Sequence, residues 1–149
     1  MKICITCSAG GHLTEAKQLL PALKNHDIFF LTTKRNDTVN LSEKYKTIFI
    51  TDPGRNPICL IKNIFESFNI LKKENPDMIL STGAGISIPS IILGKLSGKK
   101  TIFIESICRI THLSLTGKLA YPFSDIFLVQ WKQLLKNCGK KAKYWGAVI

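Results

Sequence analysis

Three short polar segments in this sequence contain the residue types that handle phosphate groups and protons. They are SAGGH at 8–12, STGAG at 81–85, and a third segment that begins at Glu105 and includes Ser106 and Arg109. Glycines let the backbone approach a ligand closely, while N–H groups at helix starts and an arginine fork bind phosphate oxygens. A carboxylate or an imidazole can move a proton. Together the segments predict a site for a phosphorylated ligand.

Each segment contributes candidate site residues. We predict Glu105 and His12 as catalytic, proton-transferring groups. The candidates for binding the acceptor and its phosphates are Gly10, Gly11, Ser81, Thr82, Gly83, Gly85, Ser106 and Arg109. Structural roles remain open beside these: two tight turns that cap helices, with His12 in one of them, and an ion pair between Glu105 and Arg109. No motif requires a metal ion or a cofactor.

The elements that must position these residues follow from the hydrophobic pattern. Short apolar runs alternate with helix-period segments, which predicts an α/β fold with a doubly wound, Rossmann-like parallel sheet. Ligands bind outside the carboxyl ends of such strands, so the three polar segments should share one rim. Pro21 is predicted to kink or interrupt the first helix, and 34–44 is predicted to be a loop with a short helix. The predicted strands are 2–7, 27–33, 46–51, 77–81, 100–104, 126–130 and a last one near 143–148.

A dinucleotide-binding fold is the first competitor, but its glycine fingerprint is incomplete. Gly83 and Gly85 are followed by Ile88 where G-x-G-x-x-G needs a third glycine. The second strand ends in Lys34 and Arg35, where an NAD site needs an acidic residue for the ribose. The basic residues would not repel a phosphate, so they leave NADP rather than NAD as the conceivable cofactor, while the incomplete fingerprint argues against either.

Cysteine usage predicts a reducing compartment. The chain has five cysteines, an odd number, and no export signal. Cys4 and Cys7 form a C-x-x-C, but they lie in a predicted strand rather than at a helix start, where redox motifs occur. We therefore interpret both as structural.

The net charge of +11 predicts attraction to polyanions such as an anionic membrane or phosphorylated substrates. The basic residues accompany no nucleic-acid-binding motif, so we expect no nucleic-acid partner. No apolar run approaches the roughly 20 residues that span a bilayer. The residues at helical spacing that form one apolar stripe are Ile58, Leu60, Ile61, Ile64, Phe65, Phe68 and Leu71. The stripe either packs on the sheet or docks on a membrane surface.

A family resemblance emerges from the segment ESICRITHLSLTGKLAYPFSDIFLVQW at 105–131, combined with SAGGH and STGAG. The chain resembles the acceptor-side, membrane-associated subunit of the split GlcNAc transferase that extends dolichol-linked oligosaccharide. It more closely resembles that subunit's bacterial capsule and exopolysaccharide homologues. The resemblance runs from Met1 to Ile149 and makes these residues one acceptor-side domain.

The resemblance implies the amino-terminal half of a GT-B glycosyltransferase, with a separate subunit supplying the half that binds the UDP-sugar. The three polar segments would line the acceptor side of the interdomain cleft. The acceptor would be a polyprenyl-pyrophosphate-linked saccharide, transfer would be inverting, and the partner would meet the open cleft and the carboxyl-terminal strand at 144–149. Eukaryotic members carry an amino-terminal membrane anchor, whereas this chain begins with its first strand. We therefore expect a cytoplasmic protein, peripheral to the inner face of the cytoplasmic membrane. The alternative is a single-chain nucleotide- or phosphate-binding Rossmann-like protein.

Overall fold

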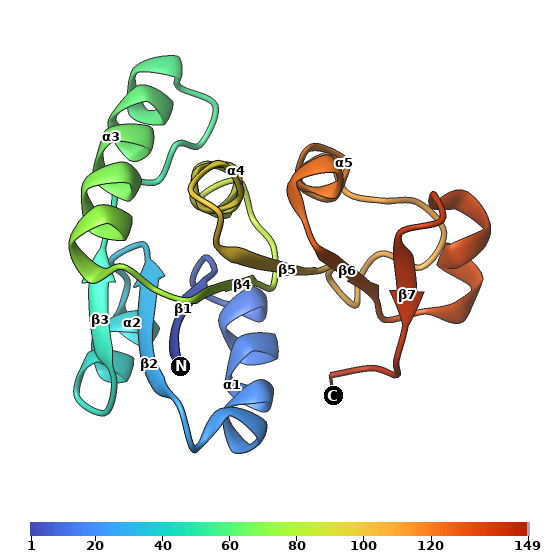
Figure 1. Ribbon diagram of the computed structural model, residues 1–149, viewed down its shortest axis with the longest axis horizontal. Helices are drawn as coiled ribbons and strands as arrows, with labels where there is room; N and C mark the ends of the chain where they lie inside the picture. The colour runs from blue at the N-terminus through green and yellow to red at the C-terminus, as the bar shows by residue number, and fades with distance from the viewer. Residues whose placement is uncertain (149) are drawn as a thin grey trace.

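The computed structural model describes residues 1–148 and contains a seven-stranded parallel sheet, which confirms the predicted fold class. The strand order is β3-β2-β1-β4-β5-β6-β7, so the chain winds outward from the centre in both directions (Figure 1). The strands are β1 (Lys2–Thr6), β2 (Asp27–Thr32), β3 (Lys46–Phe49), β4 (Met78–Ser81), β5 (Lys100–Ile104), β6 (Ile126–Val129) and β7 (Ala142–Tyr144). Ile149, the last residue of the predicted partner-facing segment, lies outside the described residues.

Helices cover both faces of the sheet. One face carries α1 (Gly11–Leu23) and α2 (Asn36–Ser42), and the other carries α3 (Pro57–Glu74), α4 (Ser87–Leu96) and α5 (Leu115–Ala120) (Figure 1). Two short 3₁₀ helices, at Tyr121–Phe123 and Lys132–Asn137, flank β6. The helix in 34–44 is confirmed as α2. Of the two predicted effects of Pro21, interruption of the first helix is wrong, because α1 continues through it to Leu23, and the kink stays a prediction.

Side-chain alternation along the central strands builds two cores. In β1, Cys4 faces the layer of α3, α4 and α5, while Ile3 and Ile5 face α1 and α2. Each of these side chains is fully buried, as expected for a parallel sheet covered on both faces. The two cores fix the central strands rigidly, and the polar loops leave from their ends.

The C-x-x-C motif lies within this packing. Cys4 and Cys7 are buried free thiols. Burial raises the pKa of the Cys7 thiol to about 12 and raises that of Cys4 as well. Thiols that stay protonated at neutral pH are poor nucleophiles and poor metal ligands, so the geometry agrees with the structural interpretation.

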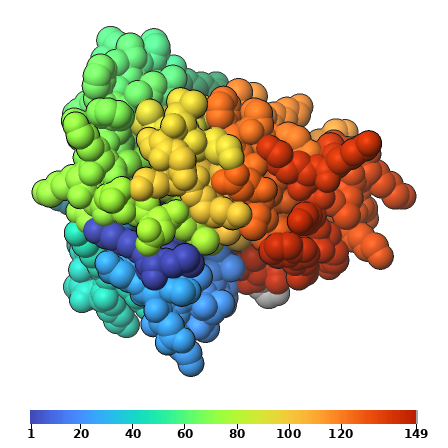
Figure 2. All heavy atoms as spheres, in the orientation of Figure 1, coloured from blue at the N-terminus to red at the C-terminus, as the bar shows by residue number. Residues whose placement is uncertain are grey.

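Helix α3 directs its polar side chains inward and its apolar side chains outward. Asn63 and Ser67 are fully buried, and the Asn63 amide donates to the Thr51 carbonyl oxygen at 2.7 Å. On the outer side, Phe65 is 65% exposed and Phe68 48% exposed. The interpretation of the stripe as core is therefore wrong except at Leu71, whose side chain is buried. Figure 2 shows this outer surface beside those of α4 and α5.

Within residues 1–148, no helix has both the length and the apolar character needed to cross a bilayer. Charged residues, among them Lys62 and Glu66, also lie on α3 beside the exposed apolar stripe.

Candidate functional site

The three polar segments lie side by side at one rim of the sheet. They follow β1, β4 and β5, which are adjacent in the strand order and run parallel. The sheet topology therefore brings the predicted site residues together, as the sequence pattern indicates.

His12 joins the first two segments. Its Nδ1 lies 2.8 Å from the Thr82 carbonyl oxygen, and the Thr82 hydroxyl donates to the His12 carbonyl oxygen at 2.7 Å. A carbonyl oxygen can only accept, so this contact assigns the proton of the neutral imidazole to Nδ1 and leaves Nε2 with a lone pair. The pairing holds the ring at the junction of the two loops with its Nε2 available to accept a proton.

Gly83 makes room for that imidazole. Its φ of +115° lies outside the range of ordinary side chains, and a Cβ there would stand 2.7 Å from His12 Cε1. The Ser81 hydroxyl accepts from the Gly83 N–H at 3.0 Å and stabilises the turn. Of the residues in STGAG, Ser81, Thr82 and Gly83 therefore position His12, and Gly85 lines a separate apolar groove described below.

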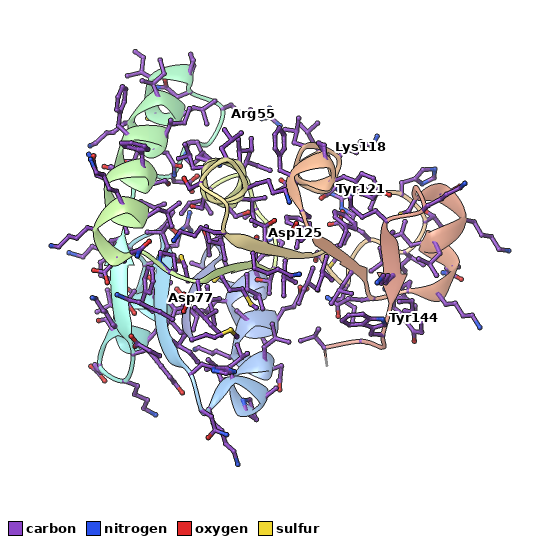
Figure 3. All side chains as sticks on the ribbon, in the orientation of Figure 1. Arg55, Asp77, Lys118, Tyr121, Asp125 and Tyr144 are labelled. Carbon is purple, nitrogen blue, oxygen red and sulfur yellow. The ribbon has the colours of Figure 1, made fainter. Side chains whose placement is uncertain are left out.

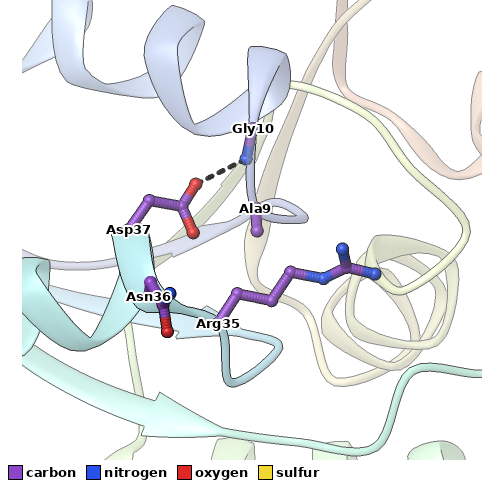
Figure 4. Close-up of a pocket in the computed structure, with 5 residues that line it drawn as sticks. All are labelled: Ala9, Gly10, Arg35, Asn36 and Asp37. Atoms are coloured by element: carbon purple, nitrogen blue, oxygen red, sulfur yellow. Dashed lines mark hydrogen bonds between the residues drawn. The ribbon is translucent and has the colours of Figure 1, made fainter.

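The SAGGH loop borders a polar pocket of about 630 Å³. Its lining includes Ala9, Gly10, Arg35 and Asp37, and the Arg35 side chain extends below Ala9 (Figure 4). The Gly10 N–H donates to Asp37 at 2.7 Å, so this predicted phosphate donor already has a partner. Gly11 opens α1, whose positive dipole end and first-turn N–H groups favour an anion beside Arg35.

Glu105 anchors the start of α5. Its carboxylate is 1% exposed and accepts hydrogen bonds from Ser106 N at 3.0 Å, Ser114 N at 2.9 Å and Ser114 Oγ at 2.9 Å. Ser114 also caps α5 by accepting from Gly117 N. A Cβ on Gly117 would clash with Glu105 Oε2, so a larger residue there would displace the carboxylate. Both carboxylate oxygens thus hold the loop in place.

A second buried carboxylate, Glu15 of α1, grips the same loop from the other side. Its Oε1 accepts from Ser106 Oγ and Ile107 N, each at 3.1 Å, and its Oε2 accepts from Gln130 Nε2 at 3.2 Å. Gln130 in turn accepts from Val148 N at 2.9 Å and so connects the carboxyl-terminal segment to the loop. Ser106 is a positioning residue in this geometry.

The expected ion pair between Glu105 and Arg109 is absent from the described part of the chain. Glu105 is buried, whereas Arg109 is exposed on the loop and belongs to none of the ion pairs formed within residues 1–148. The sequence separation suits a pair, but the loop turns Glu105 toward Ser114 instead. Arg109 is therefore available to an anionic ligand at the rim.

Sequence reasoning missed four residues of this site: Glu15, Arg35, Asp37 and Ser114. Glu15 had a usable signal, because it stands three residues after His12 on the inward face of a helix, where a carboxylate requires partners. Arg35 also follows the second strand closely, which places it near the rim. Among residues 1–148, no group of three His, Cys, Asp or Glu side chains is arranged to hold a metal ion.

This fold, with polar loops at the carboxyl rim, is that of the amino-terminal half of a GT-B glycosyltransferase. MurG from Acinetobacter baumannii has the same fold, with a TM-score of 0.79 and 13% identity, over 96% of this chain and 45% of the MurG chain. A family model described as "Oligosaccharide biosynthesis protein Alg14 like" matches residues 52–148, and the chain belongs to this family.

Two curated relatives extend the similarity along the whole chain. The human UDP-N-acetylglucosamine transferase subunit ALG14 is 28% identical over 100% of this chain and 83% of its own length. The subunit of the same name from Candida albicans is 36% identical over 99% of this chain and 78% of its own length.

Proposed function

We propose that this protein is the acceptor-binding subunit of a two-component, UDP-sugar-dependent glycosyltransferase. The observation that carries the proposal is the junction of His12, Thr82 and Gly83 at the rim of an Alg14-family fold, because it presents an imidazole lone pair beside groups suited to phosphate. The relatives named above are subunits of a UDP-N-acetylglucosamine transferase. The donor-binding half would be a separate subunit that closes over the open rim and meets the carboxyl-terminal segment.

The proposed chemistry is inverting transfer onto a hydroxyl of a polyprenyl-pyrophosphate-linked saccharide. His12 Nε2 accepts the proton of the acceptor hydroxyl as its oxygen forms the bond to the anomeric carbon, and the bond to UDP breaks on the opposite face. The start of α1, Arg35 and Arg109 offer positive charge to the pyrophosphate. Glu15 and Glu105 hold the loop that presents Arg109.

The finer context is part of the same proposal. We place the reaction in bacterial capsule or exopolysaccharide assembly, on the inner face of the cytoplasmic membrane, whereas the curated relatives named above are eukaryotic. The alternative is a single-chain phosphate- or nucleotide-binding protein, which the polar pocket beside Arg35 would suit.

Calorimetric titration of the 149-residue chain with UDP-sugars separates these functions. We expect no appreciable heat from the chain alone, because the proposal assigns the nucleotide to the other subunit. Micromolar binding of UDP by the isolated chain would favour the single-chain alternative and contradict the proposal.

We also propose that the outer face of α3 docks on the membrane that carries the acceptor. Its exposed apolar residues are accompanied by Lys62, Lys72 and Lys73, and the chain carries a net charge of +11. Apolar insertion and attraction to anionic lipids then act together, and each lysine near the surface contributes roughly 1 kcal/mol.

Replacing both Phe65 and Phe68 with serine is expected to lower the fraction bound to anionic vesicles at least tenfold, since burying each ring in lipid is worth about 1.5–3 kcal/mol. The melting temperature should stay nearly unchanged, because both rings are exposed in the folded protein. Sedimentation with vesicles at low and high salt measures the effect. Val39→Ser, on the exposed side of α2 across the sheet, is the matched control. Unchanged vesicle binding by the double variant would exclude docking through α3.

A further inference from the structure

An apolar groove opens between the starts of helices α3, α4 and α5, which cover one face of the sheet. It has a volume of about 400 Å³, within the range of roughly 300–1,000 Å³ that is usual for small-molecule sites. Its apolar lining includes Pro53, Leu60, Gly85, Ile88, Leu115 and Leu119. The groove is thus a hollow between the starts of packed helices.

The lining of the groove connects the polar rim with exposed apolar surface. Gly85 lines the groove and lies two residues after Gly83, where an added Cβ would meet the His12 ring. The lining residues Leu115 and Leu119 are 73% and 50% exposed, so the groove is continuous with exposed apolar surface of α5. A chain lying in the groove would connect the polar rim with that surface.

Positive charge accompanies the groove. Arg55 contributes to its lining, and Lys118 lies on α5 outside the lining. Figure 3 shows both side chains at the outer edge of the helix layer. Neither belongs to an ion pair within residues 1–148. An apolar hollow with an arginine in its lining suits an amphiphile whose apolar chain ends in a phosphate.

We propose that this groove binds the first isoprenoid units of the lipid-phosphate acceptor, so that the chain leaves the membrane surface and brings its pyrophosphate to the loop at 81–85. The isoprenoid identity rests on the proposed function. The groove itself rests on its geometry, its continuity with the exposed apolar surface and its charge. In this groove a methyl-branched chain should bind better than a linear chain of the same length, because each buried methyl adds favourable contact area.

Titration of the isotope-labelled full chain with farnesyl phosphate, below the micelle concentration, tests the groove directly by NMR. Saturable shifts are expected at Arg55, Leu60, Gly85, Ile88 and Thr116, which all line the groove. Dodecyl phosphate has the same main-chain length without branches and should bind roughly tenfold more weakly. Inorganic phosphate alone should leave the NMR resonances of Leu60 unshifted. Shifts confined to the outer face of α3, or equal affinity for dodecyl phosphate, would overturn the proposal.

Thr116→Trp fills the groove and should weaken farnesyl phosphate binding by about tenfold or more, since the indole occupies the apolar volume. Thr111→Trp is the control, because Thr111 is exposed and lies outside the lining. Wild-type affinity for farnesyl phosphate in a folded Thr116→Trp variant would overturn the proposal. If that variant does not fold, the NMR shift map of the unmodified chain decides the question. If the reconstituted enzyme transfers sugar but farnesyl phosphate does not bind in the groove, only the groove proposal is refuted. If farnesyl phosphate binds in the groove but the chain supports no sugar transfer with any donor subunit, only the proposed function is refuted.

Discussion

Replacing His12 with glutamine is expected to lower sugar transfer by about 10² or more in the reconstituted two-subunit enzyme, the usual range for a lost proton-transfer group. Glutamine can still donate to the Thr82 carbonyl oxygen, so the junction of the loops should survive and the melting temperature should change little. Transfer measured at saturating acceptor and donor, together with a melting curve, checks both parts.

Gly83→Ala provides a second variant that displaces the imidazole without removing it. The added Cβ would stand 2.7 Å from His12 Cε1 on a backbone with φ of +115°, so the ring and the turn must both move. Transfer should fall although His12 is present. Wild-type turnover in a folded His12→Gln variant would remove His12 from the catalytic role.

Glu105→Gln is expected to destabilise the fold by about 2–3 kcal/mol, several degrees in melting temperature. Both carboxylate oxygens accept from N–H or O–H donors, and an amide must turn its own N–H₂ toward one of them. Thermal unfolding measures the loss. Glu43→Gln, at an exposed carboxylate, is the control and should change stability little.

The same variant separates the two roles of Glu105. If Glu105 only positions the loop, Glu105→Gln should reduce transfer per folded molecule by less than about tenfold. If Glu105 transfers a proton, the role predicted from the sequence, the same substitution should reduce transfer by about 10² or more without a comparable loss of stability. The geometry favours positioning, because the carboxylate is buried and fully engaged with the loop.

The parallel sheet and the shared rim could be predicted because they follow from strong local patterns. Apolar runs with buried faces on both sides specify parallel strands, and parallel strands end at a common rim. The placement of SAGGH and STGAG needed nothing more.

The parts that could not be predicted depend on tertiary partners. The stripe on α3 has the same spacing whether it faces the core or the solvent, and only the buried contacts of Asn63 and Ser67 settle its direction. Glu105 and Arg109 are close enough in sequence to pair, but the partner of Glu105 is Ser114, nine residues away. Long-range contacts such as that of Glu15 with Ser106 have no local signature.

The central claim is that this chain supplies the acceptor half of a split transferase. The most direct measurement is transfer of sugar from a UDP-sugar to a polyprenyl-pyrophosphate-linked acceptor, with this chain and a donor-binding subunit assayed separately and together. We predict product only when both subunits are present. Product formed by this chain alone, or by the donor subunit at the same rate without it, would contradict the account.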